Sequence, residues 1–389
     1  MFPHIKEELT QNILPYWIDN VKLDDGKFLG RITGHEIPCP DAEIGGIMTA
    51  RILWTFSNAY RLLGKPEYLN MADTAKRLII GYFHDYKRGG IYWSLNPDGT
   101  CRDPKKQIYA IAFAIYGLAE FYRVSKDTEA LGIAVDLFHD IEKHSFDHEG
   151  NGYFEAFNGD WSEMSDVRLS DKDANERKTM NTHLHILEAY TGLYRVWKDT
   201  LLEAQLRNLI GLFIDKIISA DGHLKLFFTD DWTCNYDIDS YGHDIECSWL
   251  LYEAATVLGD KNLIDKVKAL VPKIADAARE GLANGLAYEK KDGVVDEDRH
   301  WWVQAEAVVG FYNSWQLTGR PEDLKASQDC WKYIQDHIID RENGEWFWSV
   351  KADGTINRDD DKAGFWKCPY HNGRMCMELI ERDSAENPA

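Results

Sequence analysis

The segment Gly90-Ile91-Tyr92-Trp93, a glycine followed by apolar and aromatic residues, recurs in varied form along the chain. The six copies are Gly26-Lys27-Phe28, Gly90-Ile91-Tyr92-Trp93, Gly152-Tyr153-Phe154, Gly222-His223-Leu224, Gly285-Leu286-Ala287-Tyr288 and Gly344-Glu345-Trp346-Phe347-Trp348. Their glycines lie 59 to 70 residues apart. Regular spacing of this kind indicates a repeat architecture in which each copy marks one structural unit.

Each copy predicts a turn followed by a short alternating strand. Second turns follow two of the copies, at Asn96-Pro97-Asp98-Gly99 and at Lys351-Ala352-Asp353-Gly354. Turn residues that flank short alternating segments are typical of β-hairpins. The copies therefore predict six short β-hairpins, spread evenly along the chain.

Two helical patterns lie between consecutive hairpins. Residues 47–63 repeat apolar side chains at helical spacing, and a second pattern runs from about residue 66 to residue 83. The junction within each pair also recurs, with Gly or Lys closing one helix and Asp or Pro opening the next. The junctions are Gly64-Lys65-Pro66-Glu67, Lys126-Asp127-Thr128-Glu129, Lys198-Asp199-Thr200, Gly259-Asp260-Lys261-Asn262 and Gly319-Arg320-Pro321-Glu322.

Twelve helices are predicted, beginning near residues 4, 44, 66, 105, 127, 178, 200, 240, 260, 299, 321 and 365. The first and last helices have no partner next to them in the sequence, so a closed ring pairs them with each other. The predicted fold is therefore all-α: a single (α/α)6-barrel domain over residues 1–389, with short β-hairpins between the helix pairs. The inner helices follow the hairpins, so their first turns face one mouth of the barrel.

The chain is strongly acidic, because 65 acidic and 44 basic side chains give a net charge of −21. This charge disfavours nucleic acid, anionic membranes and anionic ligands, and it favours a neutral small-molecule substrate. The seven cysteines are scattered without a C-x-x-C pair, which argues against a disulfide framework and indicates a reducing compartment. The N-terminal residues lack a secretory apolar core, and the longest uncharged apolar run, 108–119, is about half of the roughly 20 residues that a membrane span needs. We expect a soluble, cytoplasmic protein, and a monomer, because a closed ring leaves no unpaired repeat edge.

The first turns of the predicted inner helices carry polar and aromatic side chains that core packing does not explain. Because these turns face the same mouth, we expect their side chains to converge on one cavity. Residues three or four apart share a helix face, so His243 and Glu246, or Trp302 and Glu306, can face the cavity together. The candidate site residues are Arg51, Tyr109, Asn181, His185, His243, Glu246, Trp302, Glu306, Trp366 and His371.

These candidates also have structural interpretations. A single helical histidine is more often a partly buried structural residue than a catalyst, but three at equivalent positions of separate repeats favour function. Glu246 and Glu306 are costly to bury unpaired, and a salt bridge to Arg51 or Arg374 is the structural explanation for either. His183 lies two residues from His185 and is expected to point elsewhere. Packing or other structural roles are assigned to Trp301 and to the remaining histidines, which are His4, His35, His84, His139, His144, His148, His223, His300 and His337.

Three chemistries fit histidines and carboxylates around one cavity. Three His and a Glu are possible zinc ligands, but no local motif such as H-E-x-x-H supports a metal site. Glu246 and Glu306 match the paired carboxylates of a glycoside hydrolase, which leaves the histidines unexplained. Imidazole titrates near pH 6.5, so histidines on opposite sides of a sugar can remove a proton from carbon and return it to the other face. The sequence favours this third chemistry, which inverts the carbon centre.

Four segments resemble the cellobiose 2-epimerases of the N-acylglucosamine 2-epimerase superfamily. They are Ala50-Arg51-Ile52-Leu53-Trp54, Tyr241-Gly242-His243-Asp244-Ile245-Glu246, Trp301-Trp302-Val303-Gln304-Ala305-Glu306-Ala307-Val308-Val309-Gly310 and Trp366-Lys367-Cys368-Pro369-Tyr370-His371-Asn372-Gly373-Arg374-Met375. The resemblance extends from about Ile5 to Arg382. It implies an (α/α)6 barrel, no metal or organic cofactor, and C2 epimerisation of the reducing-end glucose of β-1,4-linked disaccharides such as cellobiose, lactose and mannobiose.

The resemblance also implies roles for the candidate residues. His243 and His371 correspond to an acid/base pair that moves the C2 proton through a cis-enediolate, and His185 corresponds to a third essential histidine near O1 and O2. Arg51 is placed to stabilise the oxyanion. The residues expected to bind sugar hydroxyls, orient the histidines or stack on the rings are Tyr109, Asn181, Glu246, Trp302, Glu306 and Trp366.

Two alternatives on the same barrel stay open: an N-acylglucosamine 2-epimerase, and an aldose–ketose isomerase that acts on mannose. A non-catalytic saccharide-binding protein needs the aromatic and carboxylate residues but not three histidines, so it is disfavoured. The long polar loop 159–178 is predicted to cover the mouth of the barrel.

Overall fold

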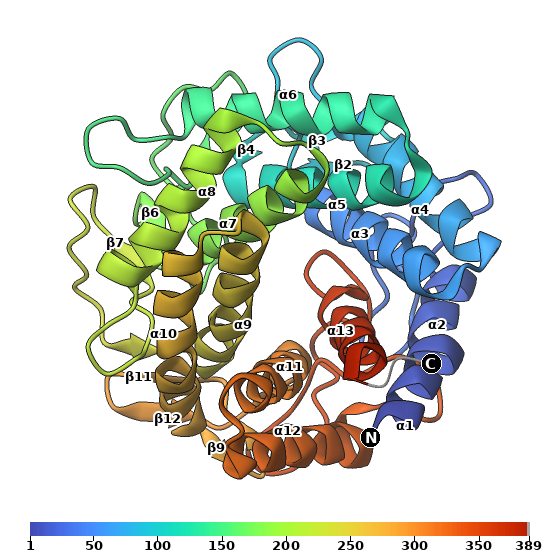
Figure 1. The fold of residues 1–389 in the computed structure, drawn as a ribbon. Coiled ribbons are helices and arrows are strands. Elements are labelled where there is room, and N and C mark those ends of the chain that lie inside the picture. Colours follow the sequence, from blue (N-terminus) through green and yellow to red (C-terminus); the bar gives the residue numbers. More distant parts are fainter. Residues whose placement is uncertain (387–389) are drawn as a thin grey trace.

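The computed structural model describes residues 1–386 and places the helices in two concentric rings (Figure 1). The inner ring consists of α3 (Gly46–Leu63), α5 (Ile108–Ser125), α7 (Met180–Val196), α9 (Tyr241–Leu258), α11 (Trp301–Thr318) and α13 (Tyr370–Glu386). The outer ring consists of α1 (Phe2–Glu7), η1 (Glu8–Ile13), α2 (Leu14–Asn20), α4 (Pro66–Leu78), η2 (Ile79–Phe83), α6 (Thr128–His144), α8 (Thr200–Leu212), η3 (Phe213–Ile217), α10 (Lys261–Arg279), α12 (Pro321–Tyr333) and η4 (Ile334–Ile338). The predicted (α/α)6 barrel is confirmed.

The inner ring is closed. Each inner helix packs against the next one along the chain, and α13 packs against both α11 and α3. The first outer helix, α1 with η1, packs against α13, and Figure 1 shows α1 and α13 next to each other. The first and last helices therefore form the predicted sixth pair.

Each Gly-aromatic segment follows an outer helix and forms a minimal hairpin. Five copies form one antiparallel bridge each, at Lys22–Phe28, His84–Ile91, Phe146–Tyr153, Ile218–Leu224 and Ile339–Trp346, and the sixth pairs β9 (Leu282–Ala283) with β10 (Gly285–Leu286). The leading glycine of every copy has a positive φ, between 69° and 106°. Glycine adopts this backbone conformation without the steric cost that other residues meet, so the repeated glycine marks a repeated turn.

Short strands join neighbouring repeats around the mouth. The segment before each inner helix pairs with the segment that follows the next hairpin, and the Ile32–Ala363 bridge does this where the ring closes. The other pairs are β1 (Ile44–Gly45) with β2 (Ser94–Leu95), β4 (Lys106–Gln107) with β5 (Ala156–Phe157), β6 (Lys178–Thr179) with β7 (Phe227–Phe228), β8 (Ile238–Asp239) with β11 (Glu289–Lys291), and β13 (Arg299–His300) with β14 (Ser349–Val350). Two more strands extend these pairs, β3 (Cys101–Asp103) beside β2 and β12 (Val294–Asp296) beside β11. The first turns of the inner helices are thus held relative to one another.

Tight turns close the opposite end of the barrel. Left-handed residues end four inner helices, at Gly64, Lys126, Gly259 and Gly319. The next outer helices begin with a capping aspartate, at Asp127, Asp199 and Asp260, or with a proline in the first turn, at Pro66 and Pro321. The predicted junction chemistry is confirmed except at α7, which ends in the extended residue Trp197.

The inner helices are buried nearly all round, as their central position requires. In α5, every residue from Ile108 to Phe121 is buried. Within residues 1–386, no helix combines the length and the apolar character needed to cross a membrane.

Candidate active site

A cavity of about 370 Å³ lies where the first turns of the inner helices meet. This volume falls in the range of about 300 to 1,000 Å³ that is typical of small-molecule sites. Nine of the ten candidate residues line it: Arg51, Tyr109, Asn181, His185, His243, Glu246, Trp302, Trp366 and His371. The tenth, Glu306, lies behind His371 rather than at the cavity wall. The sequence therefore located the cavity, while the roles of its residues stay predictions.

His371 is backed by a carboxylate. Its Nδ1 lies 2.7 Å from Oε1 of Glu306, and both side chains are buried. Burial alone would raise the pKa of Glu306, but Arg374 and His371 outweigh burial and lower it. An ionised Glu306 accepts a hydrogen bond from Nδ1–H and so leaves Nε2 of His371 as the proton acceptor.

His243 has a neutral partner instead. Its Nδ1 lies 2.7 Å from Oγ of Ser240, the residue just before α9. The ring of Trp302 contacts both imidazoles, with centroid distances of 4.8 Å to His243 and 5.6 Å to His371. Burial lowers the pKa of both histidines to about 3. Both rings are therefore neutral near pH 7 and able to accept a proton.

His185 resembles His371 in its setting. Its Nδ1 lies 2.9 Å from Oε2 of Glu188, one turn further along α7, and the pair is almost completely buried. The other oxygen of Glu188 accepts hydrogen bonds from Tyr370 and Arg374. The neighbouring His183 faces away, where its Nε2 accepts a hydrogen bond from the backbone N–H of Tyr153.

Arg374 joins the carboxylates behind the cavity. Its Nη2 donates to Oε1 of Glu246 and to Oε1 of Glu306, at 2.6 Å each. The salt bridge expected as a structural explanation for these two glutamates therefore forms with Arg374 and not with Arg51. Burial and the nearby charge of Glu306 raise the pKa of Glu246, whereas the pKa of Glu306 is lowered. Glu246 therefore holds a proton more readily than Glu306.

Two of these carboxylates and His371 form the only cluster of possible metal ligands within residues 1–386. Glu246, Glu306 and His371 place one ligand atom each within 4.8 Å of the others. Arg374 already donates to an oxygen of each carboxylate, so its guanidinium supplies the positive charge that a metal ion would otherwise bring. The predicted zinc alternative used all three candidate histidines, and His185 and His243 do not belong to this cluster.

Arg51 is a buried cation at the cavity. It is 3% exposed, donates from Nη2 to the Tyr109 hydroxyl at 2.7 Å and lies 4.3 Å from the Phe113 ring centroid. Within residues 1–386, no carboxylate forms an ion pair with it, and its Nε has no hydrogen-bond partner. A positive charge without a counter-ion stabilises negative charge that develops in the cavity.

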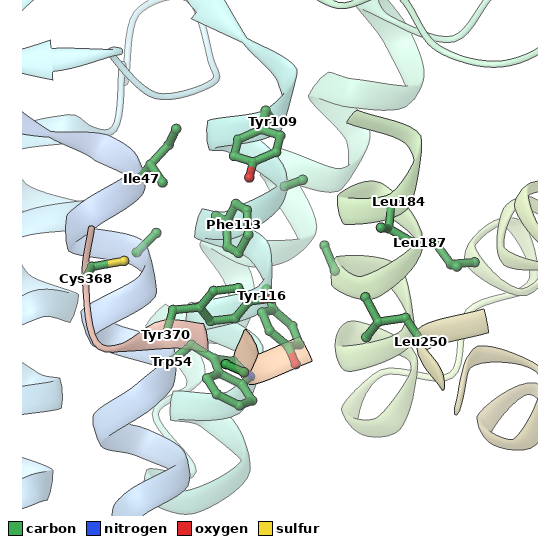
Figure 2. Close-up of a cluster of buried hydrophobic side chains, with 14 of the residues drawn as sticks. Ile47, Trp54, Tyr109, Phe113, Tyr116, Leu184, Leu187, Leu250, Cys368 and Tyr370 are labelled. Carbon is green, nitrogen blue, oxygen red and sulfur yellow. The ribbon is translucent and has the colours of Figure 1, made fainter. Parts of the chain in front are cut away.

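A group of aromatic rings lies between the mouth cavity, which Tyr109 lines, and a second cavity, which Trp54 and Tyr116 line. In Figure 2, Tyr109 and Phe113 lie above Tyr370, Tyr116 and Trp54. The last two stack at 5.0 Å with an interplanar angle of 15°. This layer separates the mouth cavity from the other end of the barrel.

Several residues at the cavity wall were not among the candidates. The stacked rings of His300 and Tyr288 line it, with centroids 4.1 Å apart, although the sequence assigned His300 a structural role. Trp301, assigned to packing, does pack on Trp348, and both also reach the wall. Residues 169–173 of the loop predicted to cover the mouth also contribute to the wall.

The family model of N-acylglucosamine 2-epimerase (GlcNAc 2-epimerase) matches residues 32–373, and the chain belongs to this family. The protein is therefore an epimerase-type carbohydrate isomerase on an (α/α)6 barrel. It is similar to the cellobiose 2-epimerase of Bacteroides fragilis, with 60% identity over 97% of each chain. The cellobiose 2-epimerase of Ruminococcus albus is 41% identical over 98% of this chain and 99% of its own. Among solved structures, the cellobiose 2-epimerase of Bacillus thermoamylovorans superposes with a TM-score of 0.93 at 43% identity, covering 98% of this chain and 99% of that one.

Proposed function

We propose that this protein is a cellobiose 2-epimerase, which interconverts glucose and mannose at the reducing end of β-1,4-linked disaccharides. Cellobiose would become glucosyl-mannose, and lactose would become epilactose. The observation that carries the proposal is the pair of neutral imidazoles of His243 and His371, both in contact with Trp302 at one cavity. The full-length similarity to proteins named for this activity supports the choice of substrate.

The reaction moves one proton. After the sugar ring opens, one imidazole of the His243–His371 pair removes the proton from C2, and the C–H electron pair moves into the C1 carbonyl to give a cis-enediolate. The imidazole that takes the proton becomes an imidazolium, whose N–H exchanges with solvent. Rotation about the C2–C3 bond turns the other face of C2 toward the His243–His371 pair. An imidazolium of the pair then donates a proton to this face, so that the pair is neutral again, the carbonyl re-forms and the ring closes as the epimer. A pair of bases in one cavity suits removal and return from opposite faces.

The negative charge of the enediolate matches the electrostatics of the mouth. Arg51 supplies a buried guanidinium that forms no ion pair with a carboxylate of residues 1–386. The inner helices also point their first turns at the cavity, and helix N-termini favour negative charge. His185 lies on the same wall, in edge contact with Tyr109 at 4.8 Å, and is placed to hydrogen-bond the oxygens at C1 and C2.

The remaining polar and aromatic residues would bind the sugar. Asn181 lines the cavity with a buried Oδ1 that accepts no hydrogen bond from residues 1–386, so a substrate hydroxyl can donate to it. The rings of Tyr109, Trp302 and Trp366 form walls on which pyranose rings stack. Glu246 faces the cavity through a carboxyl group whose raised pKa suits it to donate a hydrogen bond.

Proton NMR with cellobiose in D2O, without added metal and with a chelator present, tests the activity. We expect glucosyl-mannose to appear with deuterium at C2. Unchanged cellobiose without exchange would contradict the proposal, and mannose and N-acetylglucosamine would then test the two alternative enzymes. Release of free glucose would indicate a hydrolase.

Replacement of the histidines tests the acid/base pair. His243→Asn and His371→Asn should each slow C2 exchange by about 10²- to 10⁴-fold, the usual contribution of a general acid or base. His183→Asn is the control, because His183 is fully buried and its ring nitrogens hydrogen-bond only to the backbone. Its exchange rate should stay close to that of the wild type even if its stability falls.

A further inference from the structure

His185 hydrogen-bonds to a glutamate on its own helix. His185 and Glu188 lie three residues apart on α7, which places them on one helix face. Both are 3% exposed, and Nδ1 of the histidine is 2.9 Å from Oε2 of the glutamate. A buried imidazole beside a carboxylate donates from the nitrogen that faces it.

The second oxygen of Glu188 is also fully engaged. Oε1 accepts hydrogen bonds from the hydroxyl of Tyr370 and from Nη1 of Arg374. Burial alone would raise the pKa of Glu188, but Arg374 and His185 outweigh it and lower the pKa. The carboxylate is therefore ionised, and both donors reach it from α13, the helix that carries His371.

Arg374 extends this arrangement to the other glutamates. Its Nη1 donates a hydrogen bond to Glu188, while its Nη2 donates to Glu246 and Glu306. Glu306 in turn faces Nδ1 of His371. One guanidinium thus sits between the carboxylates that back two of the three cavity histidines.

We propose that Glu188 is a positioning residue for the epimerisation proposed above: it holds His185 as the Nδ1–H tautomer and so presents Nε2 to the cavity as a hydrogen-bond acceptor. Tyr370 and Arg374 fix the carboxylate in this orientation. The Nε2 atom then accepts a hydrogen bond from a sugar hydroxyl near C1 or C2. With the opposite tautomer, a donor would face that hydroxyl instead.

The substitution Glu188→Gln tests this tautomer directly. The amide oxygen must take the Oε1 position, because two donors point there, so the amide NH2 faces Nδ1 of His185. This donor forces Nδ1 to accept, and the proton moves to Nε2. A wrong tautomer of this kind costs up to about 10⁴-fold in a serine protease triad, so we expect kcat to fall by about 10²- to 10⁴-fold while KM changes less than about threefold.

Nitrogen-15 NMR of the histidine rings supplies a readout that a merely structural role would not move. The wild type should show a protonated Nδ1 and an unprotonated Nε2 at His185, and Glu188→Gln should show the reverse. Tyr370→Phe removes one donor but keeps the charge of Glu188, so the tautomer should persist. An Nε2–H tautomer in the wild type would overturn the proposal even if the variant failed to fold.

Glu253→Gln is the matched control. Glu253 is a half-buried glutamate at the far end of the barrel that pairs with Arg195 and contacts none of the cavity histidines. Its kcat should equal that of the wild type, and an equal loss in both variants would overturn the positioning role. The NMR result also separates the two proposals, because the tautomer of His185 can be read in a protein that proves inactive toward cellobiose.

Discussion

Helix α3 carries one arginine near each of its ends, and the two are held in opposite ways. Arg51 lies at the mouth, where its neighbours are the Tyr109 hydroxyl and aromatic rings. Arg61, near the other end, donates to Glu120 at 2.9 Å and to Glu381 and Asn58. The same residue type is thus left uncompensated at one end and neutralised at the other.

The two ends of the barrel also differ in whether their charged side chains are paired. At the far end, a smaller cavity of about 170 Å³ is lined mainly by charged side chains that pair with one another. They include Arg61 with Glu120, Arg123 with Glu120, and Arg195 with Glu253. Helix C-termini meet at that end, and they favour positive charge. The mouth is the end where helix N-termini and an unpaired arginine can stabilise an anion.

The connections at the two ends explain why the site is at the mouth. Tight turns, such as the one at Gly64, join inner to outer helices at the far end. At the mouth, hairpins and long segments return the chain, and one of these segments places residues 169–173 at the cavity wall. Only the mouth has enough chain to enclose a ligand.

Among the differences between the two ends of the barrel, the largest effect is expected when each of the two arginines is replaced by glutamine. Arg51→Gln should lower kcat by about 10²- to 10³-fold, because an oxyanion would lose its fixed cation. Arg61→Gln should change kcat by less than about threefold. It should lower the free energy of unfolding by about 1–3 kcal/mol, because Glu120 and Glu381 lose their partner. Steady-state kinetics and urea unfolding of both variants measure the contrast, and a similar kcat loss in both would remove the distinction between the ends.

The sequence predicted much of this arrangement. The spacing of the Gly-aromatic segments fixes the number of repeats, and the inner-helix starts named nine residues of the cavity wall. Those predictions succeed because helix phase and helix order depend on local spacing. Glu188 was missed, although its three-residue spacing from His185 is the signal that paired His243 with Glu246.

Other features of the site depend on how the chain folds back between helices, which residue spacing does not predict. His300 and Tyr288 reach the wall from the segment between two helices, and they stack only because that segment folds back. Arg374 was considered as a partner for either Glu246 or Glu306. That it also contacts Glu188, on a third helix, follows from the closed ring and not from local spacing.

A buried ion pair that fastens a hairpin to the mouth gives a pH-dependent prediction. His223, in the fourth Gly-aromatic copy, lies 2.7 Å from Asp244 on α9, with Asp239 and Glu280 nearby. Burial alone would lower the pKa of His223, but these carboxylates outweigh it and raise the pKa to about 9. The protonated form therefore stabilises the folded state.

The raised pKa fixes the pH window. The stabilisation by His223 is fully present below its ordinary pKa of 6.5 and is lost as the pH rises through about 9. The difference in unfolding free energy between the wild type and His223→Gln should therefore shrink by about 2–3 kcal/mol between pH 6.5 and 10. Urea unfolding across this range measures it. In an Asp244→Asn background, the same substitution should show a much smaller pH dependence, and an unchanged one would refute the ion pair.

The smallest effect concerns the tight turns at the far end. Lys126 ends α5 with φ of 60°, whereas glycine ends α3, α9 and α11 in the same left-handed conformation. Lys126→Gly should raise the free energy of unfolding by about 0.5–1 kcal/mol, because glycine adopts this conformation without steric strain. The reverse exchange, Gly259→Lys, should lower it by a similar amount, since open space surrounds Gly259 and only the backbone conformation is penalised. Urea unfolding should give opposite signs with kcat unchanged in both variants, because these turns lie at the end of the barrel opposite the cavity; equal signs would mean that side-chain contacts, and not the left-handed backbone, set the stability of these turns.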